Sequence, residues 1–190
     1  DYRTLDMLTE SLIISTSAVP IYDEKGGFHF NDPDEGALVT LAMKNNMSTE
    51  TIRNENYCVE RRTNPETGIV TSVHINPKKQ RVIYIRGAAR SVVELCEFIR
   101  FEGKDEKINR KIREEIEHKI IEMAADGFKS EAIAYSVSEL GKEREKGKYV
   151  LLGLLGIYDP PKPEVKKIVE ECKAAGIKIV IITEESSSSA

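Results

Sequence analysis

The clearest candidate for chemistry is Asp159, which stands where a long apolar segment meets two prolines, Pro160 and Pro161. The apolar segment predicts a buried strand, and the prolines end it and lead into a helix. Ligands of open α/β sheets bind outside the carboxyl ends of the strands, where a carboxylate accepts hydrogen bonds or influences a metal–phosphate site. The same aspartate could instead only cap the following helix. The residues alone leave both interpretations open.

Three other charged positions have ordinary structural explanations. Glu35 lies in the first turn of a predicted helix, where the helix dipole favours a carboxylate. Arg86 and Gly87 lie at a strand-to-helix turn, where a glycine lets the backbone approach a ligand or adopt a positive φ. Lys129 follows the end of another predicted helix, where a cation is favoured. These positions alone therefore indicate no particular site.

The composition limits the classes of function. The 190 residues carry 28 basic and 32 acidic side chains, a net charge of −4, whereas general nucleic-acid binders usually carry a basic excess. The content of 40% apolar and 32% charged residues is typical of a soluble globular protein, and no apolar run is long enough to span a bilayer. The three cysteines fit a reducing compartment, and neither they nor the three histidines have metal-ligand spacing. No GxxxxGK[ST] loop occurs, which excludes the P-loop mechanism.

Hydrophobic spacing predicts an α/β chain whose first part is an α+β domain with an antiparallel sheet flanked by helices. A helix begins at Pro33, with Asp32 or Asp34 as its N-cap. A hairpin is predicted where two alternating segments flank a turn at residues 76–79. In order, the other predictions are a helix over 5–18, a short strand over 28–30, strands over 69–74 and 81–85, helices over 88–101 and 106–125, and a strand over 132–137.

The last part of the chain shows a different pattern of secondary structure. After a charged loop or linker over 139–148, a strand over 150–158, a helix over 163–175 and a strand over 177–182 predict a βαβ unit of the parallel kind. The predicted helix turns Val165, Ile168, Val169 and Cys172 inward. We therefore expect a first domain over 1–149, a partial second domain over 150–185, and a disordered tail or linker over 186–190.

The segment from Gly153 to Val165 resembles the P-type cation-transporting ATPases, in which a G-D-P-P-R-P-E-V sequence opens the second half of the phosphorylation domain. Residues 173–183 resemble the family's next segment, which ends in T-G-D. The resemblance implies a fragment of a Rossmann-like domain of the haloacid-dehalogenase type. It also implies that Asp159, Lys162 and Thr183 lie at the hinge and phosphate side of the site.

The resemblance extends to earlier segments. Residues 32–38 resemble the D-P-x-E-x-A-L signature of the family's nucleotide-binding domain, whose glutamate lies at the adenine pocket. Residues 84–88 resemble V-K-G-A, in which the lysine lines the ATP site, and residues 127–135 resemble a segment whose arginine lies near the phosphates. The resemblance thus implies that Glu35, Arg86, Gly87 and Lys129 bind nucleotide.

One departure from the family concerns the adenine pocket. The family stacks a phenylalanine on adenine, in an F-x-x-x-x-K-x-M-S-V sequence, but residues 61–73 contain no phenylalanine. Arg61 or Arg62 would have to stack as a guanidinium, and Tyr57 is the aromatic candidate nearby.

Other departures concern the phosphate side. The family's T-G-D reads Thr183, Glu184 and Glu185 here, and two glutamates repel a phosphate. The phosphorylated aspartate of D-K-T-G-T and the G-D-G-x-N-D that supports Mg²⁺ do not occur. This sequence therefore cannot form an aspartyl phosphate by itself, and whether it is an enzyme stays open.

The resemblance implies the cytoplasmic ATP-binding domain of an integral membrane pump, which delivers ATP, with Mg²⁺, to an aspartate of the phosphorylation domain. Its partners would be ATP and the phosphorylation, actuator and transmembrane domains, without nucleic acid. The sequence contains no His-Pro pair, and in this respect it resembles the calcium- and proton-pump branches of the family. One alternative is a degenerate ATPase-like module with a scaffold or regulatory role and little or no ATP binding. A haloacid-dehalogenase-type phosphatase shares the βαβ unit but would need a D-x-D nucleophile at one of its strand ends, and this unit has none.

Overall fold

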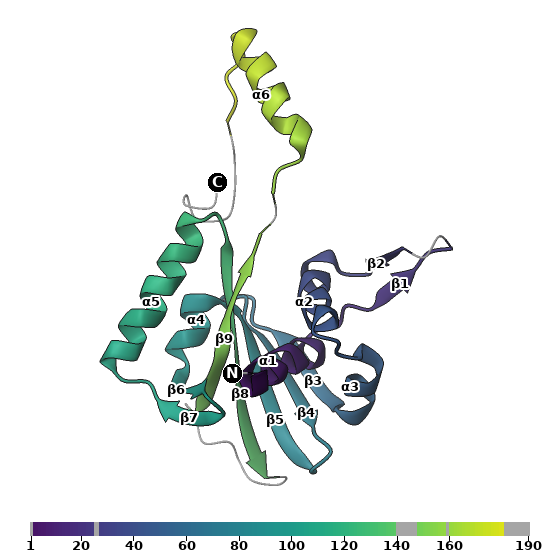
Figure 1. Ribbon diagram of the computed structural model, residues 1–190, viewed down its shortest axis with the longest axis vertical. Coiled ribbons are helices and arrows are strands. Elements are labelled where there is room, and N and C mark those ends of the chain that lie inside the picture. Colours follow the sequence, from purple (N-terminus) through teal and green to yellow (C-terminus); the bar gives the residue numbers. More distant parts are fainter. Residues whose placement is uncertain (1, 25–26, 140–147, 159, 181–190) are drawn as a thin grey trace.

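A seven-stranded sheet in the order β3-β4-β5-β8-β9-β6-β7 forms the centre of the computed structural model, and β1 and β2 form a separate two-stranded sheet (Figure 1). The structure describes residues 2–24, 27–139, 148–158 and 160–180. Among these residues, no helix is long and apolar enough to cross a membrane. The helices are α1 Tyr2–Ser15, α2 Pro33–Lys44, α3 Thr49–Glu55, α4 Ala89–Glu94, α5 Arg110–Ala125 and α6 Pro163–Ala174. The strands are β1 Pro20–Tyr22, β2 Phe28–Phe30, β3 Tyr57–Thr63, β4 Val70–Ile75, β5 Gln80–Ala88, β6 Cys96–Phe101, β7 Lys104–Lys107, β8 Lys129–Glu139 and β9 Tyr149–Ile157.

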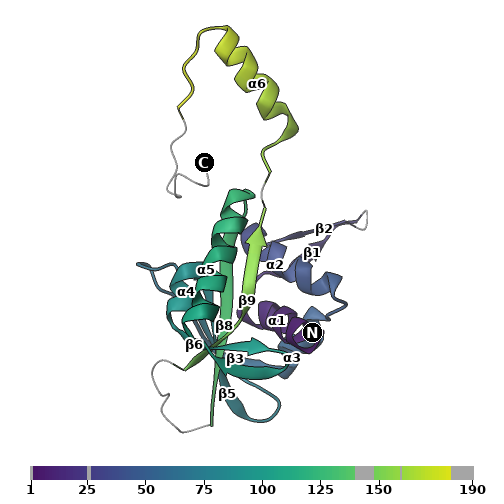
Figure 2. The same cartoon turned by 60° about the vertical axis from the view of Figure 1, so that its left-hand side comes forward.

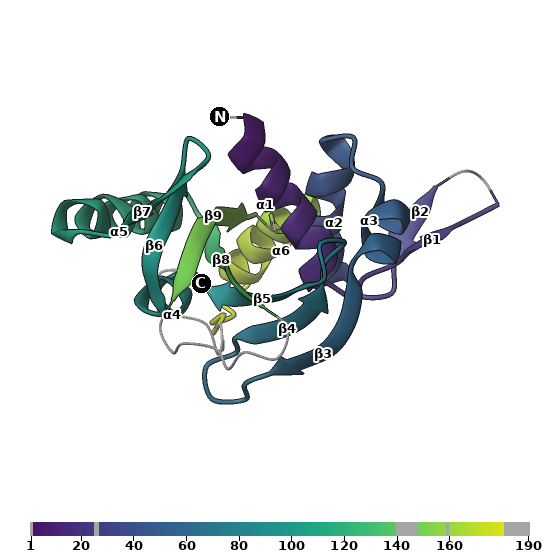
Figure 3. The same ribbon diagram turned by 90° about the horizontal axis from the view of Figure 1, so that it is seen from below.

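Two hydrophobic cores lie on opposite faces of the large sheet because side chains alternate along its strands. In β5, Ile83 and Ile85 pack with α4 and α5, whereas Val82 and Tyr84 pack with α1, α2 and α3. Figure 1 shows α4 and α5 on one side of the sheet, and Figure 3 shows α1, α2 and α3 beside one another. The prediction of a largely antiparallel sheet flanked by helices is therefore confirmed.

The predicted hairpin is also confirmed. β4 and β5 pair antiparallel, with Val73 opposite Ile83, and the turn closes by a hydrogen bond from the Asn76 amide to the Gln80 carbonyl at 3.0 Å. On its other edge β5 pairs with β8, so that Arg86 lies opposite Ile133. This arrangement places β5 inside the sheet, with covered faces on both sides.

The helix predicted over 88–101 is wrong in its second half. α4 ends at Glu94, and β6 follows it, pairing parallel with β9 and antiparallel with β7. Phe98 and Ile99 pack into opposite cores, an alternation that only a strand provides. Glu102 and Gly103, with φ of 46° and 76°, turn the chain into β7. The next helix therefore begins at Arg110 rather than at residue 106.

The βαβ unit predicted over 150–182 also differs from the structure. Its first strand, β9, lies within the large sheet between β8 and β6, because its side chains fill both cores. Residues 177–180 form no strand, and residues 181–182 and the predicted tail lie outside the described residues. The division after residue 149 falls at the start of β9, so we propose that two domains meet after Ile157 instead.

Helix α6 forms where it was predicted but lacks the predicted inward face. It stands beyond the carboxyl end of β9 (Figure 2), and none of its residues is buried. Val165 and Ile168, which were expected to face inward, are 41% and 55% exposed. Nothing among the described residues covers this face.

Candidate functional site

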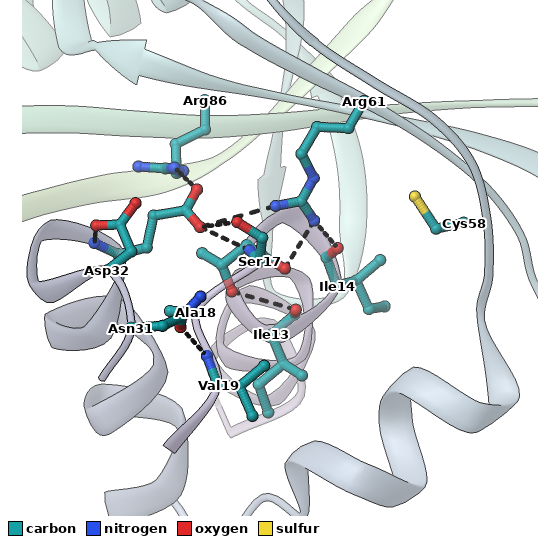
Figure 4. Close-up of polar contacts among 12 residues, drawn as sticks. Ile13, Ile14, Ser17, Ala18, Val19, Asn31, Asp32, Cys58, Arg61 and Arg86 are labelled. Atoms are coloured by element: carbon teal, nitrogen blue, oxygen red, sulfur yellow. Dashed lines mark hydrogen bonds and ion pairs between the residues drawn. The ribbon is translucent and has the colours of Figure 1, made fainter. Parts of the chain in front are cut away.

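Helix α2 begins in a way that fixes the direction of Glu35. Asp32 caps the helix, because its Oδ1 accepts a hydrogen bond from the Glu35 amide at 3.2 Å. Pro33 takes the first helical position, where its missing N–H leaves no bond unmade. Of the two predicted caps, the structure therefore selects Asp32. The Glu35 carboxylate then contacts the side chains of Arg86 and Arg61. Figure 4 shows both arginine side chains reaching from the sheet toward Ser17.

Glu35 and Arg86 form a direct ion pair. Arg86 Nη2 donates to Glu35 Oε1 at 2.7 Å, although the two residues lie 51 positions apart in the sequence. Arg86 Nη1 donates to Glu131 Oε2 at 3.1 Å, so one guanidinium joins two carboxylates. The side chains of Arg86, Glu35 and Glu131 are 9%, 12% and 13% exposed, so the cluster is largely buried from solvent. Two of the predicted nucleotide-binding residues thus meet in space.

Arg61 joins this cluster at its other end. Its Nη1 lies 3.7 Å from Glu35 Oε2, the oxygen that also accepts from the amide and the hydroxyl of Ser17 at 2.6 and 2.9 Å. The planar guanidinium of Arg61 is therefore held against the carboxylate of Glu35. Arg62, the alternative, is largely exposed and lies 3.9 Å from Glu60. We call Arg61, Glu35, Arg86 and Glu131 the charged quartet.

The carboxyl end of α1 is satisfied by arginine side chains instead of a glycine cap. Arg61 Nη2 donates to the carbonyls of Ile14 at 3.2 Å and Thr16 at 2.7 Å, and Arg53 Nε donates to the carbonyl of Ile13 at 3.4 Å. Burial lowers the pKa of Arg53, and the charge of Arg61 acts in the same direction. These contacts position Ser17, and through it Glu35, because the helix end otherwise leaves its last carbonyls without partners.

Gly87 and Lys129 lie together in a separate depression. A cavity of about 870 Å³ between β5, the start of β8 and α5 is lined by both residues and also by Glu131. A Cβ on Gly87 would lie 3.3 Å from the Cα of Ile69, just before β4, so a side chain at this position would crowd the backbone there. Glu131 lines this cavity and also binds Arg86, which connects the cavity to the charged quartet.

Of the three residues predicted on the phosphate side, the structure describes Lys162. Asp159 and Thr183 lie outside the described residues. Lys162 is exposed and directly precedes α6, whose first residues it caps without a side-chain hydrogen bond. α6 stands apart from the large sheet in Figure 1.

Sequence reasoning missed Glu131 and Ser17. Glu131 had a signal, because it shares a strand face with Ile133 and Tyr135, and a carboxylate in line with buried apolar residues indicates a buried partner. Ser17 had none, because its role depends on how the end of α1 meets α2. Among the described residues, no group of three or more histidine, cysteine, aspartate or glutamate side chains could hold a metal ion.

Comparison with known proteins identifies the family. The model described as "P-type ATPase, cytoplasmic domain N" matches residues 4–164. A calcium-transporting ATPase of Bacillus subtilis is 31% identical over 157 residues, which cover 80% of this chain and 18% of the relative. Human calcium-transporting ATPase type 2C member 1 is 28% identical over 83% of this chain and 17% of its own length, and the putative plasma-membrane-type calcium-transporting ATPase 13 of Arabidopsis thaliana is 27% identical over 95% and 19%.

The chain therefore spans less than a fifth of the length of these relatives. The match to domain N includes the whole large sheet and both of its helical layers. It also includes all four members of the charged quartet. By this match the chain belongs to the P-type cation ATPases, with residues 4–164 corresponding to their cytoplasmic domain N.

Proposed function

We propose that this chain binds ATP through domain N of a cation-transporting pump and presents the γ-phosphate to an aspartate that this sequence does not contain. The contact between Glu35 and Arg86 supports the proposal most directly, because it joins two residues assigned to the nucleotide site from separate sequence motifs. In the whole pump, we further propose, the domain lies on the cytoplasmic side and works with phosphorylation, actuator and transmembrane domains. The calcium-transporting relatives make calcium the first ion to test.

The charged groups are suited to the two ends of a nucleotide. Glu35 accepts hydrogen bonds, as a carboxylate at an adenine amino group would, and Arg86 and Arg61 supply flat cations beside it. Gly87 and Lys129 line the neighbouring cavity, where an ammonium group can balance phosphate charge. Mg²⁺ supplies charge neutralisation on the phosphates when it is bound. The described residues offer no cluster of histidine, cysteine, aspartate or glutamate side chains that could hold this ion.

A second candidate function is a scaffold or regulatory module with little ATP binding. It is favoured by the quartet itself, because Arg61, Glu35, Arg86 and Glu131 neutralise one another in the absence of any ligand. A nucleotide would have to replace some of these internal contacts, which lowers its net binding free energy.

A titration with ATP and Mg²⁺ separates the two candidates. ¹H–¹⁵N NMR spectra of the chain should show saturable shifts at the amides of Glu35, Arg86, Gly87 and Lys129, and Lys129→Gln should weaken binding about tenfold by removing one charge-assisted contact. Lys107→Gln, a change on exposed β7, serves as the matched control and should leave binding unchanged. Spectra that stay unchanged up to about 50 mM ATP would leave the scaffold function as the better proposal.

A further inference from the structure

A second cavity, outside the charged quartet, has the features of a binding site. It measures about 530 Å³ and lies where the end of α1 meets α3 and the first residues of β3. Ile14, Arg53, Tyr57, Arg61 and His74 are among its lining residues, whereas Glu35, Arg86 and Lys129 are not. Of the quartet, it therefore touches only Arg61. We propose that this cavity binds a small organic oxyanion, a phosphate or carboxylate group carried on a compact apolar body.

Two guanidinium groups supply the charge for such a ligand. Arg53 lies in α3 and Arg61 lies in β3. Each side chain donates a hydrogen bond to a carbonyl just after the end of α1, and this contact restricts its conformation. Arg61 Nη1 is buried and makes no hydrogen bond with any described residue, since Glu35 is 3.7 Å away. A buried donor without an acceptor is uncommon, and this one belongs to a side chain that lines the cavity.

The residues that line the cavity carry an excess of positive charge. Arg53 and Arg61 are both among them, and no aspartate or glutamate is. The charge of Arg61 contributes to the lowered pKa of Arg53, so the two cations lie close enough to repel each other. An anion between them would relieve this repulsion.

His74 provides the second, independent observation. It is 3% exposed, and neither ring nitrogen makes a hydrogen bond of good geometry with a described residue, although a buried imidazole normally does. Burial lowers the pKa of His74 to about 4; the charge of Arg61 acts in the same direction and the backbone of Asn56 in the opposite one. The ring is thus neutral at pH 7, with one N–H donor and one acceptor buried beside the cavity.

The shape of the cavity indicates more than a bare ion. Ile14 and the largely exposed ring of Tyr57 give it an apolar side, opposite in character to the two arginines. A phosphate or carboxylate alone is much smaller than the cavity. A compact ring or alkyl group that carries the oxyanion would cover Ile14 and Tyr57 while the anionic end meets Arg53 and Arg61.

The test uses the whole chain with inorganic phosphate and phenyl phosphate as probes, followed by ¹H–¹⁵N NMR of backbone amides and of the His74 ring. Phenyl phosphate should give saturable shifts at His74, Arg53 and Tyr57 without shifts at Gly87 and Lys129, and it should bind more tightly than inorganic phosphate. A bound anion stabilises the imidazolium, so phenyl phosphate should also raise the pKa of His74. Shifts that grow linearly to about 50 mM of both probes would overturn the proposal and leave a water-filled cavity.

Two variants keep this test decisive. Arg53→Gln should weaken phenyl phosphate binding about tenfold, because it removes one charge-assisted contact. His74→Phe should weaken binding too, and it is expected to fold at least as stably as the parent because it removes an unpartnered buried polar group. Equal affinity in the parent and in His74→Phe would overturn the assignment. ATP shifts at Arg86 in the same samples report on the nucleotide site separately, so failure of one proposal is distinguishable from failure of the other.

Discussion

Replacing Arg86 by methionine should destabilise the fold far more than removal of a surface arginine. Arg86 holds Glu35 at 2.7 Å and Glu131 at 3.1 Å, and all three side chains are at most 13% exposed. Loss of one partner from a buried ion pair costs about 3–5 kcal/mol, because a charge is left buried without compensation. Glu35 keeps the amide and hydroxyl of Ser17, so we expect the lower end of that range, about 3 kcal/mol.

Urea unfolding at pH 7 measures this difference, with the slope against denaturant as a check that the unfolded state is unchanged. Arg90→Met is the matched control: Arg90 also binds a glutamate, Glu117, at 2.6 Å, but its side chain is 61% exposed. Solvent screens an ion pair this exposed, so the control should lose little stability.

The double variant Arg86→Met with Glu131→Leu tests the cause. If the cost comes from an uncompensated charge at Glu131, removing that charge should restore more than half of the lost stability, because an apolar pair replaces a buried ion pair at little cost. Equal losses in Arg86→Met and Arg90→Met would refute this reasoning. So would a double variant whose loss equals the sum of the single losses.

Three further predictions concern other parts of the fold. The pKa of His74 is about 4 in the folded chain and about 6.5 in the unfolded chain, so only the unfolded state gains a proton between those values. The free energy of unfolding should therefore fall by about 2.5 kcal/mol from pH 7.5 to pH 4.5. In urea titrations over the same pH range, the loss in His74→Phe should be smaller by this amount. Gly36→Ala should cost about 1–3 kcal/mol in thermal unfolding, because its Cβ would lie 2.8 Å from the Cβ of Phe30; an unchanged midpoint would mean that β2 moves freely. Tyr135→Phe should cost about 1 kcal/mol, because the phenol donates to Asp105 at 3.2 Å, and Asp105→Asn measured beside it should show non-additivity.

The sequence was sufficient where local pattern and tertiary environment agree. The hairpin of β4 and β5 follows from alternation and a turn, and α2 follows from Asp32 and Pro33. Prediction from the sequence failed at β6, because Val92, Cys96 and Ile99 also fit one face of a helix. Pairing with β9, 53 residues later, decides that segment, and such a partner leaves no local trace. Glu102 and Gly103 were the missed signal, because a glycine between two strand-like segments favours a tight turn.

The candidate site divides in the same way. Glu35 and Arg86 were predicted from a family resemblance, and the structure brings them into contact. Arg86 also binds a second carboxylate, that of Glu131. This contact follows only from the pairing of β5 with β8, which places Glu131 two residues from the partner of Arg86, on the same face of the sheet. The cavity at His74 depends on where α1 ends relative to β3, a distance that no local pattern encodes.

The position of β9 has a mechanical consequence. It is bonded to β8 on one edge and to β6 on the other, and the chain leaves it directly toward α6. The hydrogen bonds of a ladder run across the strands, so a pull on α6 along the axis of β9 would load many of them at once in shear instead of opening them one after another. Domain N should therefore resist force at this exit as one stiff body. A displacement of α6 would turn the whole sheet before it extracted the strand.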